Sequence, residues 1–250
     1  MNKMIGALLP ISLIFLWSLG TYSGIIDPLF LSAPHEVVYQ LWIGLFSDDP
    51  ELAEHLGVTI LRSIAGFVLS VAVGVPLGLL IGRIKWLADA CQPTIDFFRS
   101  VPASALFPLF LFMFGTGDLA KIMVVIYAAS LIVLVNTAYG AMQVRNSRLL
   151  AAKVMGASKI QAFWSIVLPE SMPGIFAGLR IALSMSFVLI IVTEMFIGTN
   201  VGLGYYIINA QMVYRIPEMY AGIVLAGMVG YFANILLLSV EKKALHWVGK

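Results

Sequence analysis

Six long apolar stretches constrain this chain more than any other feature of its sequence. They lie at about Ile5–Tyr22, Ser63–Ile81, Ala103–Phe114, Ile122–Met142, Ile175–Ile197 and Ala221–Val240. A helix needs roughly 20 mostly apolar residues to cross a bilayer, so the pattern predicts an all-α, polytopic membrane protein with about six transmembrane helices. The third stretch is short and carries Pro102 and Pro108, so we expect it to be kinked or to begin earlier.

The composition indicates that lipid is the main solvent. Hydrophobic residues make up 60% of the chain and charged residues 11%, against roughly 45–50% and about 25% in soluble domains. The formal net charge is only +2 and Lys and Arg form no run, which argues against nucleic-acid binding. Cys91 is the single cysteine, which excludes an intrachain disulfide and a cysteine-cluster metal site. We place His35, His55 and His246 in loops without ligand spacing, so no metal site is expected.

The first apolar stretch has one feature of a signal peptide, because Lys3 precedes it. No small-x-small cleavage site follows the stretch, so we expect an uncleaved transmembrane helix. In the second stretch, Gly66, Gly74 and Gly78 recur at multiples of four residues. Small residues at this spacing let two helices approach closely in lipid, and we expect these glycines to serve that close approach.

The distribution of Lys and Arg predicts the orientation, because these residues favour the cytoplasmic side of a membrane. Residues 22–61 contain six acidic residues and neither Lys nor Arg. Three other regions are basic, at Arg83, Lys85 and Arg99, at Arg145, Arg148, Lys153 and Lys159, and at Lys242, Lys243 and Lys250. We therefore expect the acidic region, which includes Asp48 and Asp49, to lie outside and both termini to lie in the cytoplasm.

The acidic outer region has a helical pattern of its own. Apolar residues follow Ser32-Ala-Pro34 at helical spacing, namely Val37, Val38, Leu41, Trp42 and Leu45. Such a pattern predicts a short helix in the membrane interface, beginning at Ser32 or around Pro34.

The longest cytoplasmic segment, about residues 143–173, has the pattern of a helix–turn–helix. Its apolar residues at helical spacing are Leu149, Ala152, Met155, Ile160 and Phe163. Gly156 interrupts the pattern, Ser158 can cap a second helix, and Pro169 is expected to close it. An apolar face in a cytoplasmic loop favours a partner protein. A helix resting on its own bundle or on lipid headgroups remains open as an alternative.

This segment resembles a known family motif. Ala151-Ala152-x-x-x-Gly156-Ala157, followed by Ile166-x-Leu168-Pro169, looks like the EAA motif of binding-protein-dependent ABC transporter permeases. In that family the motif forms a coupling helix that docks on the ATP-hydrolysing subunit. Leu150 stands where the family usually has Glu, which puts an ion pair from that position in doubt. The residues that the resemblance assigns to ATPase coupling are Leu150, Ala151, Ala152, Gly156, Ala157, Ser158, Phe163, Leu168 and Pro169.

Other segments resemble the nitrate/sulfonate/taurine (bicarbonate) branch of the same family. They are Leu61-Arg62-Ser63 with Gly66-Phe67, Ser100-Val-Pro102 with Pro108-Leu-Phe110, Phe114-Gly115-Thr-Gly117, Gly202-Leu-Gly204-Tyr205, and Glu241…Trp247. The resemblance implies a type I importer permease fold and a single transmembrane domain over residues 1–250. It also implies a small anion or organic acid as substrate, of the nitrate, sulfonate, taurine or bicarbonate class.

The partners follow from the resemblance as well. It implies a second permease copy, expected as a homodimer, two ATPase subunits and an extracytoplasmic solute-binding protein, in a bacterial inner membrane among its lipids. The chain has no P-loop, because Gly156-Ala-Ser-Lys159 lacks the second glycine. We therefore expect ATP and Mg²⁺ on the partner ATPase and no cofactor or catalytic residue in this chain.

Ionisable and polar residues inside the spans are candidates for the substrate path. They are Arg62, Arg180, Ser184 and Glu194. The three charged residues, Arg62, Arg180 and Glu194, also lie close enough to the membrane interface for their side chains to reach it or to pair with a neighbour. A membrane-embedded enzyme is disfavoured, because it needs reactive groups at one depth. The main alternative is a secondary active transporter without an ATPase, although the inverted repeats and paired broken helices of such proteins are not found.

Overall fold

The computed structural model describes residues 2–48 and 50–246, with side chains from residue 8 onward. Within that part of the chain every regular element is a helix, which confirms the all-α expectation. The sequence predictions for Asp49, Trp247 and Lys250 lie outside the described residues, as does that for the Lys3 side chain. The helices form two compact units, residues 1–59 with 199–229 and residues 60–198 with 230–250.

Within residues 2–48 and 50–246, four helices are long and apolar enough to cross a membrane. They are α3 (Glu51–Arg83), α6 (Asp118–Met142), the continuous helix Lys159–Phe196, and α11 (Ile216–Ala244). These confirm the second, fourth, fifth and sixth predicted spans. The helix α1 (Asn2–Tyr22) covers the first predicted stretch, and its crossing of the membrane stays a prediction.

The third predicted span is bent. The predicted stretch, residues 103–114, corresponds to the short 3₁₀ helix η1 (Ala103–Leu106) and α5 (Phe107–Phe114). Helix α4 (Lys85–Ser100) precedes it, and the two arms meet at 82°. The expected kink is therefore present. The helical state of residues 85–100 was not predicted, because this segment is amphipathic and contains Pro93, so it reads as a polar connection.

The first unit contains α1, α2 (Pro34–Phe46) and α10 (Leu203–Met212), with the beginnings of α3 and α11. Helix α2 confirms the short helix predicted near Pro34. Ala33 precedes it, and its N–H donates to Glu36 Oε2 at 3.2 Å. Val37 is buried while Val38 and Trp42 are exposed, so α2 is amphipathic as expected.

Side chains of α3 cap the start of α10. The Gly202 N–H donates to His55 Nδ1 at 3.0 Å, and the Leu203 N–H donates to Thr59 Oγ1 at 2.7 Å. These bonds satisfy N–H groups that a helix start leaves without intrahelical partners. Burial raises the pKa of nearby Tyr206 to about 12. The prediction that His35 and His55 lie in loops was wrong, since they belong to α2 and α3.

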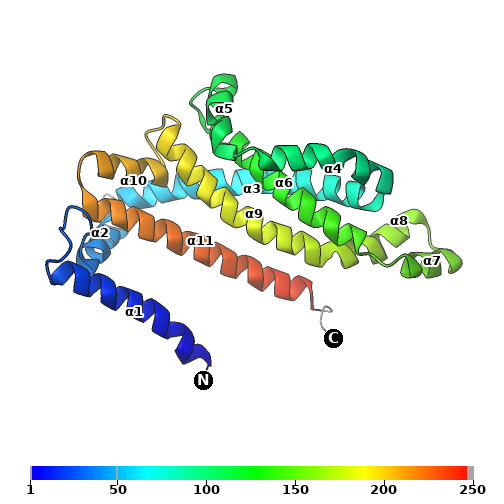
Figure 1. The fold of residues 1–250 in the computed structure, drawn as a ribbon, viewed down its shortest axis with the longest axis horizontal. Helices are drawn as coiled ribbons and strands as arrows, with labels where there is room; N and C mark the ends of the chain where they lie inside the picture. The colour runs from blue at the N-terminus through cyan, green and yellow to red at the C-terminus, as the bar shows by residue number, and fades with distance from the viewer. Residues whose placement is uncertain (1, 49, 247–250) are drawn as a thin grey trace. The chain divides into compact units, whose positions relative to one another are not determined.

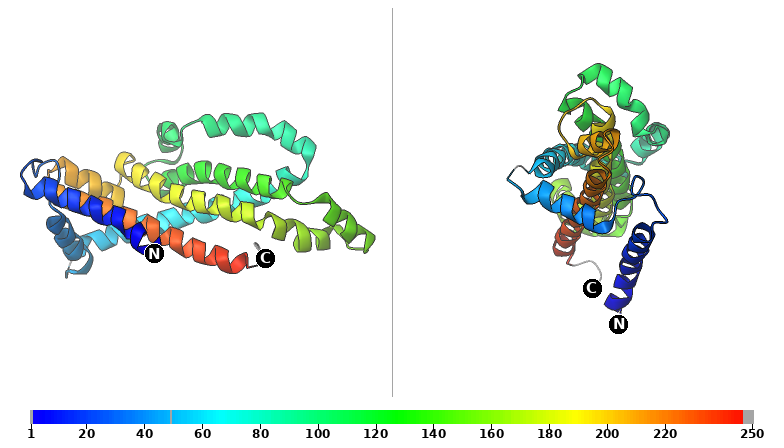
Figure 2. Two further views of the ribbon diagram at one scale, coloured as in Figure 1. Left: turned by 60° about the horizontal axis from the view of Figure 1, so that its bottom comes forward. Right: turned by 90° about the vertical axis from the view of Figure 1, so that its left-hand side faces the viewer.

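The second unit is built around α3, α6 and α9 (Leu168–Phe196). Helices α6 and α9 lie side by side, as Figure 1 and the left-hand view of Figure 2 show. Their buried side chains, with those of α5, form the main core, which comprises Phe107, Phe110, Val124, Val125, Ala129, Val133, Ala182, Leu189, Ile190 and Ile197.

Glycines bring α3 against α6, as the sequence predicted. A Cβ added at Gly74 would lie 2.8 Å from the Ser130 carbonyl oxygen, and one at Gly78 would lie 2.5 Å from that of Leu134. At Gly66 it would lie 2.7 Å from Val125 Cγ1. Because real side chains do not approach so closely, only glycine allows this backbone separation at Gly74 and Gly78.

Candidate functional site

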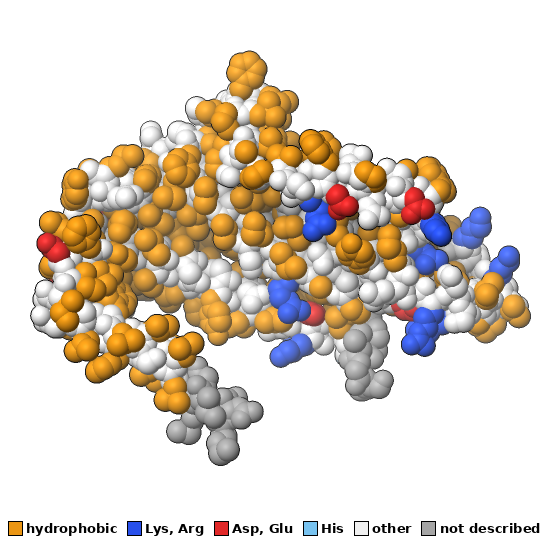
Figure 3. All heavy atoms as spheres, in the orientation of Figure 1, with side chains coloured by type: hydrophobic (Ala, Val, Ile, Leu, Met, Phe, Trp, Pro, Cys, Tyr) orange, Lys and Arg blue, Asp and Glu red, His pale blue; other side chains and the backbone are white. Residues whose placement is uncertain are grey.

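The residues assigned to ATPase coupling lie in and next to one projecting segment of the second unit. We call residues 146–167 the α7–α8 loop. It contains α7 (Asn146–Val154), α8 (Lys159–Ala162) and the π-helical turn η2 (Phe163–Val167). The loop extends past the ends of α6 and α9 (Figure 1). On the face drawn in Figure 3, Lys and Arg side chains gather toward this end of the second unit.

Gly156 ends α7 in the way that the sequence predicted. Its φ is +81°, in the left-handed region that residues with a Cβ adopt only at a cost. The Gly156 N–H donates to the Lys153 carbonyl at 3.0 Å, and the Ala157 N–H donates to the Ala152 carbonyl at 2.9 Å. This pair of bonds is a Schellman motif, which fixes the direction in which the chain leaves α7.

Ser158 caps the second helix, which confirms its predicted capping role. The Gln161 N–H donates to Ser158 Oγ at 3.2 Å, and the Ser158 N–H donates to Gln161 Oε1 at 2.8 Å. These reciprocal bonds form a capping box. The turn between α7 and α8 is therefore defined on both sides by local hydrogen bonds.

The prediction that Pro169 closes the helical pattern was wrong. Helix α8 continues through η2 into α9, so that residues 159–196 run as one helix. In η2 the Leu168 N–H donates to the Phe163 carbonyl, five residues earlier. This wider turn stands directly before Pro169 and rearranges the hydrogen bonds that a proline ring would otherwise break. The proline is accommodated without ending the helix.

The α7–α8 loop exposes several large apolar side chains among its polar ones. The exposed fractions are 62% for Leu150, 88% for Val154, 79% for Met155, 71% for Ile160 and 63% for Trp164. Ala151 is also exposed, whereas Ala152 is buried and Leu149 is half-buried. The predicted face was therefore only partly right. Met155 and Ile160 belong to the exposed surface, but in α7 it runs along Leu150 and Val154, four residues apart.

Two of the assigned residues anchor the loop. Phe163 and Leu168 pack against a small cluster of Leu79, Ala141 and Ile175, from α3, α6 and α9. Pro169 is half-buried next to them, and Ala157 is half-buried in the turn. The assigned residues thus divide into an exposed set and a set that holds the loop to the second unit.

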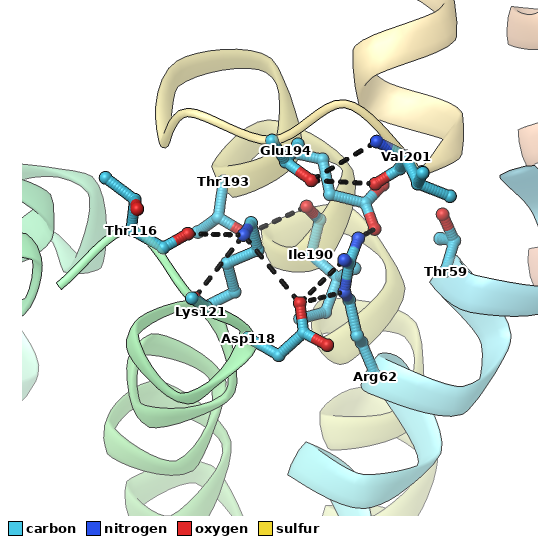
Figure 4. Close-up of polar contacts among 12 residues, drawn as sticks. Thr59, Arg62, Thr116, Asp118, Lys121, Ile190, Thr193, Glu194 and Val201 are labelled. Atoms are coloured by element: carbon cyan, nitrogen blue, oxygen red, sulfur yellow. Dashed lines mark hydrogen bonds and ion pairs between the residues drawn. The ribbon is translucent and has the colours of Figure 1, made fainter. Parts of the chain in front are cut away.

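A second cluster joins α3 to the start of α6 and the end of α9. Arg62 Nη1 donates to Glu194 Oε1 at 2.7 Å, and Arg62 Nε donates to Asp118 Oδ1 at 2.9 Å (Figure 4). The Arg62 and Glu194 side chains are 8% and 0% exposed, while that of Asp118 is 59% exposed. The structure brings together two of the predicted path candidates, in the ion-paired arrangement that the sequence left open.

Lys121 completes this cluster. Its Nζ donates to the carbonyl oxygens of Thr116 and Gly117 at 3.1 and 3.4 Å, and lies 3.9 Å from Asp118 Oδ1. The side chain is 1% exposed. Asp118 and Lys121 were not predicted as site residues. The available signal was a charged pair, three residues apart, directly before the apolar stretch that begins at Ile122.

The other two path candidates lie apart from this cluster. Arg180 Nη2 donates to Glu241 Oε2 at 2.6 Å, which joins α9 to the last turns of α11. Arg180 Nε is buried and has no hydrogen-bond partner in the described residues. Ser184 is exposed, and its hydroxyl donates to the Arg180 carbonyl at 3.3 Å.

The described residues contain no group of three or more His, Cys, Asp or Glu side chains that could hold a metal ion. Their chemistry is that of a helical membrane protein with a projecting apolar loop and paired charges between helices.

Comparisons with known proteins agree with this architecture. Residues 74–245 match the family described as binding-protein-dependent transport system inner membrane component. The chain is 32% identical over 210 residues to the nitrate import permease protein NrtB of Synechocystis sp., covering 82% of this chain and 76% of NrtB. It is 29% identical over 244 residues to the putative aliphatic sulfonates transport permease protein SsuC of Bacillus subtilis, covering 98% and 87%.

A solved structure shows the same fold. The inward-facing MetNI methionine ABC transporter contains a chain that matches with a TM-score of 0.62 and 19% sequence identity, covering 84% of this chain and 97% of that chain. This likeness confirms the expected type I importer permease fold. The protein belongs to the binding-protein-dependent transport system inner membrane components, the multi-pass permeases of ABC transporters.

Proposed function

We propose that this chain is the permease subunit of an ATP-driven importer and that its α7–α8 loop docks on a separate ATPase subunit. The exposed apolar surface of that loop, in a chain of this family, carries the proposal. Val154 and Met155 are 88% and 79% exposed at the basic end of the second unit. Apolar surface exposed to water is unfavourable, and a partner that covers it recovers that free energy.

The hydrogen bonds of the loop support docking by shape. The Schellman motif at Gly156 and the capping box at Ser158 hold α7 and α8 at a defined angle. A surface held in this way loses little conformational freedom on binding. Leu150, at the position where the family usually has Glu, adds apolar area in place of a charge.

The complete transporter then contains two copies of this chain, two ATPase subunits and an external solute-binding protein. ATP with Mg²⁺ binds to the ATPase subunits, because this sequence has no P-loop. The complex lies in a bacterial inner membrane. Both termini of this chain and the α7–α8 loop face the cytoplasm, in agreement with the positions of Lys and Arg.

Arg180 and Ser184 are proposed to face the solute path. Arg180 follows Leu168 by twelve residues, about 18 Å along α9, and 39% of its side chain is exposed. A guanidinium exposed to lipid at such depth is unfavourable, which favours an aqueous path on this side of α9. Arg180 Nη2 is paired with Glu241, but its guanidinium remains partly exposed, which favours an anionic substrate of the nitrate, sulfonate, taurine or bicarbonate class.

Arg62 and Glu194 are proposed to have a different role from Arg180 and Ser184. Their side chains are only 8% and 0% exposed and pair with each other, so they are proposed to act on the path by holding α3 against the first turn of α6 and the last turn of α9. Direct binding of the transported anion is therefore assigned to Arg180 and Ser184.

Co-purification tests the proposal. A tagged chain extracted in mild detergent is expected to bring down an ATPase subunit, and Val154→Asp is expected to lose it because a charge enters the apolar surface. Val154→Met is the matched control, since it keeps an apolar side chain at the same position. Equal recovery of the ATPase with both variants would contradict docking at this surface. Recovery of the chain alone in several detergents, with uptake retained, would favour the secondary transporter.

A further inference from the structure

Glu170 ties the first helix of the α7–α8 loop to the helix that follows the loop. It lies in the first turn of α9, directly after Pro169. Its Oε1 accepts from Arg148 Nη1 at 2.5 Å, and its Oε2 accepts from the Arg145 backbone N–H at 3.2 Å. One carboxylate thus contacts both the start of α7 and its first turn.

The other attachments of α7 differ in kind. Ala152 of α7 is 5% exposed, and Val144, which precedes α7, is 4% exposed. Apolar burial of this kind is non-directional. Along the chain, α7 reaches α9 only through the turn at Gly156, the single turn of α8 and the π-helical turn η2. A π-helical turn departs from regular α-helical hydrogen bonding. The path along the chain from α7 to α9 is therefore less regular than the direct hydrogen bonds to Glu170. The two bonds to Glu170 bypass it.

We infer that Glu170 is a positioning residue that makes α7 and α9 move together when the ATPase displaces the loop. The inference rests on the proposed docking of the ATPase on the α7–α8 loop. A carboxylate that holds a guanidinium and a backbone N–H at the same time fixes the orientation of both. A displacement of α7 is then passed directly to the base of α9.

Helix α9 is where such a displacement has consequences. It is continuous from Leu168 to Phe196 and carries both Arg180 and Glu194. A movement imposed at Glu170 therefore reaches the exposed cation assigned to the path and the ion pair with Arg62. The Arg148 side chain is 56% exposed, so the pair contributes little to stability and its role is geometric.

The test uses the complete transporter reconstituted in vesicles, with the co-purifying ATPase and the solute-binding protein. Glu170→Gln keeps the size of the side chain and removes its charge. The solute moved per ATP hydrolysed is expected to fall by about two- to thirtyfold, the range typical of residues that modulate coupling between sites. ATPase recovery and the thermal midpoint of the permease are expected to stay unchanged. Asp96→Asn is the control, because it breaks the exposed Asp96–Arg99 pair on α4 without touching α7 or α9.

The charge exchange Glu170→Arg with Arg148→Glu distinguishes the loss of this ion pair from a general folding defect. It restores an ion pair between the same two helices, so it is expected to recover most of the coupling that Glu170→Arg alone loses. An unchanged ratio of solute to ATP in Glu170→Gln would overturn the inference, as would a charge exchange that restores nothing. Failure of the proposed function is recognised separately, because then the unaltered chain binds no ATPase.

Discussion

Arg62 and Glu194 lie 132 residues apart in the sequence, yet Arg62 Nη1 donates to Glu194 Oε1 at 2.7 Å. The carboxylate is fully buried, and the same guanidinium also holds Asp118 from α6. Each of the three central helices of the second unit therefore contributes to one charge cluster. Because buried charges are strongly unfavourable when unpaired, this cluster holds α3 at a fixed place against the start of α6 and the end of α9.

Removing either partner of this pair is expected to destabilise the protein. Arg62→Gln removes the guanidinium that pairs with the buried Glu194 carboxylate, at a cost of about 3–5 kcal/mol. Glu194→Gln is expected to cost less, because Arg62 keeps its contacts with Asp118. The double variant is expected to lose less than the sum of the two single losses, because neither charge remains. Thermal midpoints of the four purified proteins in detergent measure this. Additive losses would show that the two side chains do not depend on each other.

Gly156 is expected to be required for its backbone conformation alone. A Cβ at this position would meet no atom within 4 Å, so Gly156→Ala introduces no clash within the chain. The φ of +81° nevertheless costs an Ala residue about 1–2 kcal/mol. Gly156→Asn is expected to be tolerated better, since Asn adopts this region more readily. ATPase recovery in the co-purification should rank Gly above Asn and Asn above Ala. Equal recovery with all three would contradict the role of the turn.

The contact between α3 and α6 predicts opposite results for two glycines. Gly78→Ala places a Cβ 2.5 Å from the Leu134 carbonyl oxygen, and overpacking of this kind costs about 1–3 kcal/mol. Gly230→Ala on α11 meets nothing within 4 Å and is expected to be neutral or slightly stabilising. Thermal midpoints distinguish the two variants. A Gly78→Ala protein as stable as the unaltered chain would mean that the helices are farther apart than described.

The orientation predicts which positions a membrane-impermeant thiol reagent can reach. Since Cys91 is the single cysteine, a Cys91→Ala background allows single cysteines at Asp48 and Lys153. The first is expected to react from outside intact cells and the second only after the membrane is opened. The reverse pattern would invert the topology and remove the α7–α8 loop from the cytoplasmic ATPase.

Local signals explain what the sequence could predict. The apolar stretches located α3, α6, α9 and α11, and the prolines near residue 102 indicated the bend between α4 and α5. Gly156 and Ser158 marked the ends of α7 and α8, because a left-handed residue and a capping hydroxyl act on neighbouring backbone atoms. The spacing of Gly74 and Gly78 likewise predicted a close helix contact.

Long-range pairing explains what the sequence could not predict. Arg62 and Glu194 were recognised as ionisable residues in spans, but their pairing depends on how α3, α6 and α9 assemble. Lys121 was overlooked because it adjoins an apolar stretch, where a cation normally reaches the interface. In the structure it bonds the carbonyl oxygens of Thr116 and Gly117. Glu170 gave no signal, since its partners Arg145 and Arg148 lie across the loop.

ATP-driven uptake by the reconstituted transporter is the most direct test of whether this chain is an ABC importer permease. Vesicles containing this chain and its co-purified ATPase, supplied with the solute-binding protein, are expected to accumulate the anion only when ATP is hydrolysed. Val154→Asp is expected to abolish this uptake while the chain still inserts into the membrane. Uptake driven by an ion gradient, with this chain alone and without ATP, would contradict the account.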